Sequence, residues 1–177
     1  AAQSAIAIHN ANQFERVLAS SGLHALPEVR REFIPYLIDD SRPARNESLT
    51  VLFADMRGFT QLTTSLGDAG EIQEMLSEFV SMLANVIVQN HGIANKFLGD
   101  GVMAIFRGDA ACVNAVSTAC GVVGKFDHML TRWSKKTSIS LRFLDIGVGI
   151  ATGKVILGML GNDTLREFTV MGTPSQG

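Results

Sequence analysis

The feature that most constrains the fold is a hairpin pattern in the middle of the chain. Residues 93–98 and 102–106 are short, mainly apolar runs that resemble strands, and the turn-forming sequence Gly99-Asp100-Gly101 stands between them. Such a turn between two apolar runs predicts a β-hairpin. Helical patterns lie on both sides of it, so the chain is expected to combine strands and helices in an α+β fold.

The clearer helical pattern precedes the hairpin, over residues 71–91. Its apolar residues recur at steps of three and four, and Gly92 follows as a C-terminal stop. These apolar positions are Ile72, Met75, Leu76, Phe79, Val80, Leu83, Val86 and Ile87. Residues 109–133 predict a second long helix, in which Gly121 and Gly124 weaken the pattern.

Further strands are expected before and after these elements. Residues 49–54 form a short apolar run, as in a buried strand, and residues 141–151 are strand-like with alternating apolar positions. We expect Gly153 to interrupt this strand, which continues over 155–160, and residues 168–171 to form the last strand. The order β-α-α-β-β-α-β is that of a ferredoxin-like palm, a mainly antiparallel sheet with helices packed on it.

The first part of the chain differs from the rest. Residues 2–18 are rich in alanine, and Pro27 followed by an acidic residue is typical of a helix start. Residues 39–48 are polar and turn-rich, which predicts a linker. We therefore expect an N-terminal helical and linker segment over 1–48 and one domain over 49–177.

Composition excludes several classes of protein. The net charge of the 177 residues is −2, so binding to nucleic acid through bulk electrostatics is not expected. Apolar stretches are interrupted well before the roughly 20 residues that a membrane span needs, and no secretory signal opens the chain. We expect a cytoplasmic domain, including the cytoplasmic part of a membrane-tethered protein. Its Cys112 and Cys120 are expected to be buried, reduced thiols.

Two acidic residues stand where packing does not explain them. Asp55 ends the apolar run of 49–54, and the Gly58 turn after it leads into a helix N-terminus whose N–H groups suit phosphate. Asp100 lies at the tip of a hairpin whose strands are expected to pair beside the first strand. Two carboxylates that meet at neighbouring strand ends, beside a phosphate-binding loop, suit a pair of Mg²⁺ ions.

Asp55, Asp100 and Lys96, which precedes Asp100 in the same hairpin, each have a simpler interpretation when they are taken alone. Asp55 is explained equally well as a helix N-cap, Asp100 as an ordinary turn aspartate, and Lys96 as a solvated lysine on a strand. The combination favours the functional interpretation, since the simpler ones require separate coincidences. A Walker-type nucleotide site is not expected, because residues 149–154 have the wrong spacing for its loop.

These segments resemble the class III nucleotidyl cyclases, the catalytic domain of adenylate and guanylate cyclases. The resemblance runs from Leu49 to Gly172 and rests on several motifs. They are the DxxGFT loop after the first strand, the KxxGDGxMAxF hairpin, the GIATGKVxxGxxG segment at 149–161 and the FTVMG strand. The GG[DE]EF loop of the palm-type diguanylate cyclases is absent from the sequence.

The resemblance implies a site with two metal ions, Mg²⁺ or Mn²⁺. Asp55 and Asp100 match the two metal-binding aspartates, and the carbonyl of Met56 matches a backbone metal ligand. Both aspartates are then catalytic through the ions that they hold. Other positions in the two motifs are implied to bind the substrate, the triphosphate loop among them: Arg57, Gly58, Phe59, Thr60, Leu98 and Gly99.

The resemblance also implies which purine is bound. Lys96 stands at a position that is Lys in adenylate cyclases and Glu in guanylate cyclases, and Thr169 stands at the position of its partner, Asp or Thr for adenine. An ammonium donor and a hydroxyl fit the N1 acceptor and the N6 donor of adenine. Lys154 stands where the family often has a phosphate-contacting Arg, which it replaces as a point charge.

The activity that the resemblance implies is conversion of ATP to 3′,5′-cyclic AMP and pyrophosphate. In this family the metal ligands and the purine-binding residues come from opposite subunits of a head-to-tail dimer. This chain contains both sets, which implies a homodimer with two sites. The N-terminal segment is similar to elements that transmit a signal from an upstream sensor or regulatory domain.

The end of the sequence departs from the family pattern. The family's last strand leads into a helix with an Asn and, four residues on, an Arg, which stabilise the transition state. Here Gln176 stands at the Asn position, and the Arg position lies beyond residue 177. We therefore expect the domain to be incomplete at its C-terminal end. An inactive nucleotide-binding or dimerisation module, or a guanylate cyclase, is the alternative to an adenylate cyclase.

Overall fold

A computed structural model describes the backbone of residues 45–161 and 166–172 and the side chains of residues 46–156. The expected N-terminal helical segment and Gln176 lie outside these ranges. The elements are β1 (Arg45–Arg57), α3 (Phe59–Leu66), α4 (Ala69–Gln89), β2 (Ile93–Phe97), β3 (Gly101–Phe106), α5 (Ala111–Lys136), β4 (Asp145–Gly161) and β5 (Arg166–Gly172). None of the described helices is long and apolar enough to cross a membrane.

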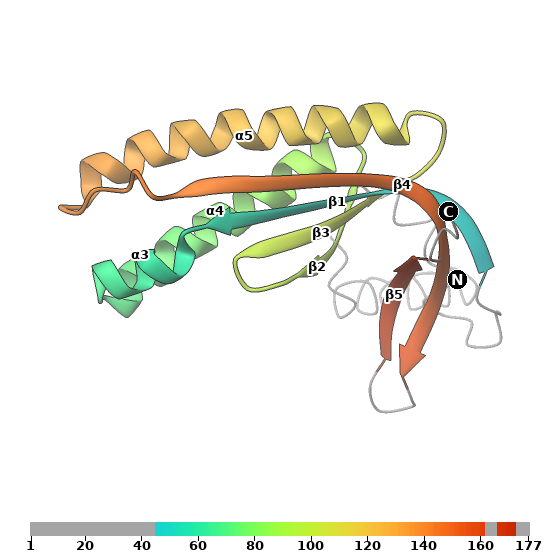
Figure 1. The fold of residues 1–177 in the computed structure, drawn as a ribbon, viewed down its shortest axis with the longest axis horizontal. Helices are drawn as coiled ribbons and strands as arrows, with labels where there is room; N and C mark the ends of the chain where they lie inside the picture. The colour runs from blue at the N-terminus through green and yellow to red at the C-terminus, as the bar shows by residue number, and fades with distance from the viewer. Residues whose placement is uncertain (1–44, 162–165, 173–177) are drawn as a thin grey trace, which may run out of the picture.

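The described strands form one sheet in the order β2-β3-β1-β4-β5, and every pair of neighbours is antiparallel. Helices α3 and α4 connect β1 to β2, and β3 lies between these two strands in the sheet. Helix α5 connects β3 to β4, and β1 lies between that second pair of strands. Two interlocked units of this kind make the predicted ferredoxin-like palm, which is confirmed. Figure 1 shows that β4 bends along its length, so that the β4–β5 hairpin projects from the rest of the sheet.

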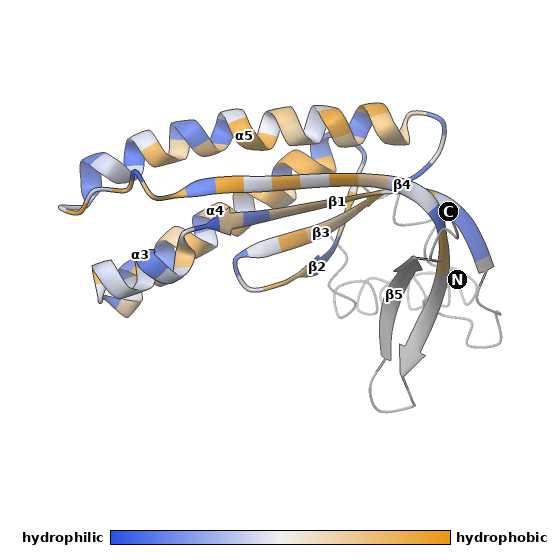
Figure 2. Ribbon diagram, in the orientation of Figure 1, coloured by the Kyte–Doolittle hydropathy of each residue, from blue (hydrophilic) through white to orange (hydrophobic). Residues whose placement is uncertain are grey.

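The helices cover one face of the sheet. Successive residues of a strand point to opposite faces, and in β1 Leu52, Ala54 and Met56 are at most 2% exposed, in one cluster with residues of α4 and α5. Phe53, on the opposite face, is 49% exposed. Figure 2 shows apolar residues along β4 where it runs beneath α5. The other face is therefore the one on which side chains of β1 reach solvent.

Aromatic side chains close the core between α4 and α5. Phe79 and Phe126 are buried and meet edge to face, with ring centroids 5.7 Å apart. Such a pair adds about 0.5–1.5 kcal/mol to the stabilisation from burial alone. Trp133 is buried in the same core, and its indole N–H donates to the carboxylate of Glu78 at 2.7 Å. The last turns of α5 are thereby fixed against α4.

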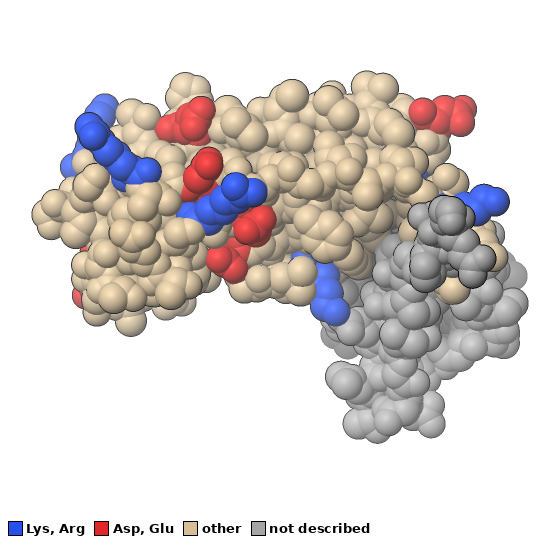
Figure 3. All heavy atoms as spheres, in the orientation of Figure 1, with Lys and Arg blue, Asp and Glu red and all other residues tan. Residues whose placement is uncertain are grey.

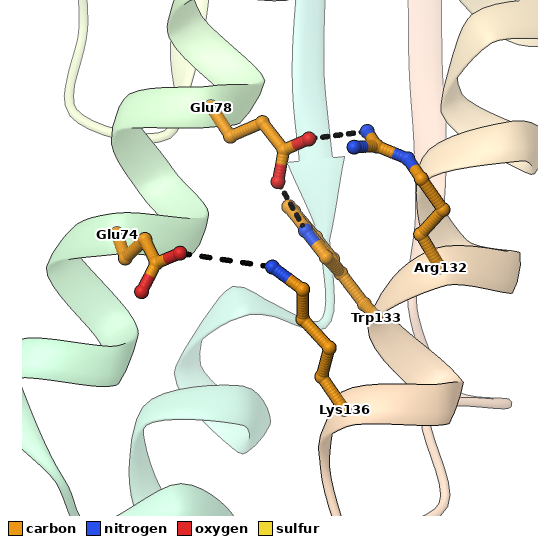
Figure 4. Close-up of polar contacts among 5 residues, drawn as sticks. All are labelled: Glu74, Glu78, Arg132, Trp133 and Lys136. Carbon is orange, nitrogen blue, oxygen red and sulfur yellow. Dashed lines mark hydrogen bonds and ion pairs between the residues drawn. The ribbon is translucent and has the colours of Figure 1, made fainter.

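Charged groups also join α4 to α5 (Figure 4). The carboxylate of Glu78 pairs with the guanidinium of Arg132, and the ammonium of Lys136 lies 3.7 Å from the carboxylate of Glu74. Burial acts to raise the pKa of Glu78, but the Trp133 indole, Arg132 and Lys136 together hold it below its ordinary value. Folding therefore stabilises the ionised form of Glu78.

This linkage predicts a pH dependence of stability. A carboxyl group with a lowered pKa stabilises the folded protein above the pKa of the unfolded chain, about 4.3 for Glu, and loses that contribution as the pH falls through the folded value. Glu78→Gln should lower the free energy of unfolding at neutral pH by less than about 1 kcal/mol, since Arg132 is exposed. Urea unfolding from pH 7 downward should show this deficit shrinking below about pH 4.3. A loss of unfolding free energy of equal size at every pH would contradict the linkage. The control is Glu74→Gln, which changes an exposed carboxylate on the same helix.

The first strand begins earlier than predicted. Residues 45–48, expected to belong to a linker, are part of β1, because they pair with residues 154–157 of the long strand β4. The side chain of Glu47 also forms an ion pair with Arg107, at the end of β3, at 2.5 Å. Backbone pairing with a distant strand outweighs the polar composition of this segment.

The predicted course of β4 is wrong at two points. Residues 141–144, expected in a strand, form a turn in which the N–H of Leu144 donates to the carbonyl of Leu141 at 3.0 Å. Gly153 does not interrupt the strand, because it pairs with Leu49 in an unbroken ladder. A Cβ on Gly153 would meet no atom within 4 Å, so no close contact requires glycine at this position.

Both cysteines are exposed, so the prediction of buried thiols is wrong. The buried positions of α5 form a separate stripe, which consists of Ala111, Ala115, Thr118, Val122, Phe126, Met129 and Trp133. Cys112 and Cys120 lie off this stripe. The thiol of Cys112 lies 3.3 Å from the hydroxyl of Thr152 and 3.4 Å from that of Thr50, and these hydrogen bonds lower its pKa.

Candidate functional site

Asp55 and Asp100 lie next to each other at one end of the sheet. Asp55, near the end of β1, pairs with Gly101, the first residue of β3. The N–H of Met56 donates to the carbonyl of Asp100 at 2.9 Å, which ties the two segments together. Figure 3 shows acidic and basic side chains gathered where β1 ends beside the β2–β3 turn. The structure thus brings together the two acidic segments that the sequence singled out.

A tight turn holds Asp100 in this place. The N–H of Leu98 donates to the carbonyl of Gly101 at 2.9 Å, and Gly99 has a φ of +70°. Residues with a side chain are disfavoured at that angle. A Cβ on Gly101 would lie 3.0 Å from the carbonyl oxygen of Ala54. The two glycines therefore allow the turn and its close approach to β1.

The loop after β1 presents backbone N–H groups. Gly58 has a φ of +83° and is the N-cap of α3, and the N–H of Leu62 donates to its carbonyl at 3.0 Å. A Cβ on Gly58 would lie 2.6 Å from the carbonyl oxygen of Phe143, so only glycine fits there. No side chain within the described ranges caps this helix, which leaves N–H groups of its first turn available. With Arg57 beside them, they suit an anionic group such as phosphate.

The donor set fits a hard divalent cation. Because Gly58 is the N-cap of α3, the simpler interpretation of Asp55 as a helix cap is wrong. The side chain of Met56 is buried, so only its backbone carbonyl can contribute. No group of three or more His, Cys, Asp or Glu side chains that could hold a metal occurs in the described part of the chain. Two carboxylates suffice for Mg²⁺, which completes its shell with phosphate oxygens and water.

Lys96 lies on β2, an outer strand of the sheet, and is half-buried. Ala94 pairs with Ala104 and Lys96 pairs with Met103, so Asn95 is an extra residue and β2 contains a bulge. A bulge bends the strand and changes the direction of the side chains beside it. This irregularity was not predicted, because apolar alternation along one strand does not reveal it.

Lys154, on β4, and Thr169, on the neighbouring strand β5, lie away from Asp55, toward the C-terminal part of β4. Asp55 pairs with Gly147, and Lys154 lies seven residues farther along β4, a distance of about 23 Å along an extended strand. Thr169, of which only the backbone is described, pairs with Gly158, farther along still. One copy of the chain therefore does not place Lys154 or Thr169 beside Asp55.

Gly147 is a site-lining residue that was not predicted. It pairs with Asp55 across β1 and β4. A Cβ on Gly147 would lie 2.9 Å from Oδ1 of Asp55 and 2.9 Å from Nε of Arg57. A glycine inside a strand is a signal of close approach by another group, and this signal was present in the sequence.

Comparison with known proteins identifies the family. Residues 42–174 match the family described as the adenylate and guanylate cyclase catalytic domain. The terminal-differentiation specific adenylate cyclase of Dictyostelium discoideum is 29% identical over 163 residues, which cover 90% of this chain and 7% of that protein. An adenylate cyclase of Anabaena cylindrica is 28% identical over 131 residues, 73% of this chain and 26% of that protein. The chain thus spans only a small part of these relatives.

Solved structures agree with this match. The adenylyl cyclase CyaB from P. aeruginosa is 30% identical, with a TM-score of 0.68 over 74% of this chain and 68% of that one. The guanylyl cyclase Cya2 shares the fold, with a TM-score of 0.65, 24% identity and coverage of 74% of this chain and 66% of that one. Since the family match spans most of the sequence, the chain belongs to the adenylate and guanylate cyclase catalytic domain family.

Proposed function

We propose that this domain is an adenylate cyclase that converts ATP to 3′,5′-cyclic AMP and pyrophosphate. The observation that carries the proposal is the adjacency of Asp55 and Asp100, joined by the hydrogen bond from Met56, beside the Gly58 loop. In the reaction the 3′-oxygen of ATP forms a bond to the α-phosphorus, and the bond from that phosphorus to the bridging oxygen of pyrophosphate breaks. The hydroxyl proton leaves to solvent.

The residues of this chain have distinct roles in the proposed reaction. The carboxylates of Asp55 and Asp100 and the carbonyl of Met56 would hold two ions, Mg²⁺ or Mn²⁺. When bound, such ions acidify the attacking hydroxyl and neutralise charge on the triphosphate. The N–H groups after Gly58 and the guanidinium of Arg57 orient the triphosphate, so that attack occurs in line.

Support for ATP over GTP comes from Lys96 and Thr169. The ammonium of Lys96 donates to N1 of adenine, and the hydroxyl of Thr169 accepts from the N6 amino group. Guanine instead requires an acceptor opposite its N1–H and N2–H groups, which an ammonium cannot supply. The relatives named as adenylate cyclases are in line with this choice.

The proposed enzyme is a head-to-tail homodimer. Within one chain, Lys154 and Thr169 lie far along β4 and β5 from Asp55. A second copy that runs in the opposite direction supplies its purine-binding residues, Lys96 and Thr169, to the metal-binding half of the first. Each dimer then contains two equivalent sites, because each chain contains both halves.

The test is a cyclic nucleotide assay with ATP and with GTP, in Mg²⁺ and in Mn²⁺, on this chain and on the longest product of its gene. We expect cyclic AMP from ATP and little cyclic GMP. Binding of ATP without product in either form would favour an inactive nucleotide-binding module, the alternative that Gln176 raises. Predominant cyclic GMP would favour a guanylate cyclase.

A further inference from the structure

Asp55 stands between two glycines in the sheet. It pairs with Gly101 on β3 and with Gly147 on β4. On the face away from the helices, residues that pair across strands lie side by side, so no neighbouring side chain stands on either side of Asp55 in this row. The glycine of β3 is explained by the turn that carries Asp100 and by its approach to Ala54. The glycine of β4 requires a separate explanation.

Two polar groups occupy the space above Gly147. A Cβ there would lie 2.9 Å from Oδ1 of Asp55, 2.9 Å from Nε of Arg57 and 3.2 Å from a terminal nitrogen of the same guanidinium. Real Cβ atoms essentially never approach other atoms within 3.0 Å. The carboxylate and the guanidinium therefore both lie over the backbone of β4, in a position that a side chain at residue 147 would prevent.

A second glycine of β4 provides the contrast. Gly149 lies two residues farther on, so it is on the same face of the same strand, and it pairs with Phe53. A Cβ on Gly149 would meet no atom within 4 Å. The strand itself therefore does not demand glycine on this face, and the requirement at Gly147 comes from the two side chains of the site.

We propose that Gly147 is a positioning residue, whose missing side chain lets the Asp55 carboxylate and the Arg57 guanidinium lie together over β4. This inference rests on the proposed function, in which Asp55 holds metal and Arg57 orients the triphosphate. The three atoms nearest to a methyl group at this position belong to the ends of two side chains, Asp55 and Arg57. The fold therefore tolerates Gly147→Ala, while both functional groups must leave the positions over β4 that they hold in the wild type.

The test compares Gly147→Ala with Gly149→Ala. Both changes remove a glycine from the same strand and the same face, so both should raise stability slightly or leave it unchanged. Mn²⁺ is titrated in the presence of a non-hydrolysable ATP analogue, and free Mn²⁺ is measured by electron paramagnetic resonance. We expect Gly147→Ala to weaken Mn²⁺ binding about 10- to 100-fold, the range typical for loss of a group that orients a metal ligand. We expect Gly149→Ala to bind Mn²⁺ like the wild type.

A double variant tests whether the effect passes through these side chains. Arg57→Ala removes one of the two groups that crowd position 147, so Asp55 has room to adjust. Adding Gly147→Ala to Arg57→Ala should therefore weaken Mn²⁺ binding less than it does in the wild-type background. Equal losses in both backgrounds, or equal losses for Gly147→Ala and Gly149→Ala, would overturn the inference. Absence of Mn²⁺ binding and of cyclic AMP formation in the wild type would instead contradict the proposed function.

Discussion

Asp100→Ala is expected to reduce cyclic AMP formation by more than about 10²-fold, the effect typical for loss of one group that stabilises a transition state. The residue lies in the turn between β2 and β3, and its backbone carbonyl accepts from the N–H of Met56. That hydrogen bond does not involve the side chain, so the substitution removes a carboxylate without removing the link between the strands. The measurement is the initial rate of cyclic AMP formation at saturating ATP and Mn²⁺.

The control for this prediction separates charge from folding. Asp100→Asn keeps the shape of the side chain and removes its charge, so it should lose activity like Asp100→Ala. Asp109→Ala removes an exposed carboxylate just before α5 and should keep full activity. Thermal unfolding should show all three variants within a few degrees of the wild type, as usual for surface substitutions. Activity in Asp100→Ala within a few-fold of the wild type would refute the metal assignment.

The order of elements could be predicted from the sequence, because each long element has a strong local signal. The helix α4 carries apolar residues at helical spacing, and its buried positions Met75, Phe79 and Leu83 are among those that the pattern marked. The Gly99-Asp100-Gly101 turn marked the hairpin that the structure contains. These signals lie within one element and need no knowledge of its partners.

The strand boundaries could not be predicted, because they depend on a partner strand. Residues 45–48 are polar, yet they extend β1 because β4 is long enough to pair with them. The same ladder keeps Gly153 in a strand although glycine alone predicts a break. The bulge at Asn95 is likewise a property of two strands, since it arises from a shift in register against β3.

The candidate site likewise combines residues that have a local sequence signal with one that depends on a partner strand. Asp55 and Asp100 follow recognisable local patterns, and the structure places their segments side by side. Gly147 has no motif of its own, and its relation to Asp55 and Arg57 becomes visible only when β1 and β4 are paired. The two acidic residues of the candidate site could thus be marked from local patterns, whereas the relation of Gly147 to them required the tertiary arrangement.

Exchanging the proposed base-reading residues is expected to invert the nucleotide preference. In Lys96→Glu with Thr169→Cys, the new carboxylate accepts from N1–H and N2–H of guanine and faces the N1 acceptor of adenine without a donor. A site built to hydrogen-bond one partner rejects a mismatched one strongly, because its polar groups are left unpaired. We expect the ratio of kcat/KM for ATP to that for GTP to fall by at least about 10²-fold.

A matched charge change decides whether this effect belongs to base recognition. Lys125→Glu makes the same substitution at an exposed position of α5 and should leave the ratio for ATP and GTP as it is in the wild type. Lys96→Glu alone should lower the rate with ATP without giving the full gain with GTP, because its partner still suits adenine. A double variant that loses activity with both nucleotides equally, at an unchanged ratio, would show that Lys96 and Thr169 support the site without reading the base. Lys96 lies on β2 and Thr169 on β5, the two outer strands of the sheet. An inverted ratio of kcat/KM for ATP and GTP would therefore also show that residues from both outer strands contact the same nucleotide.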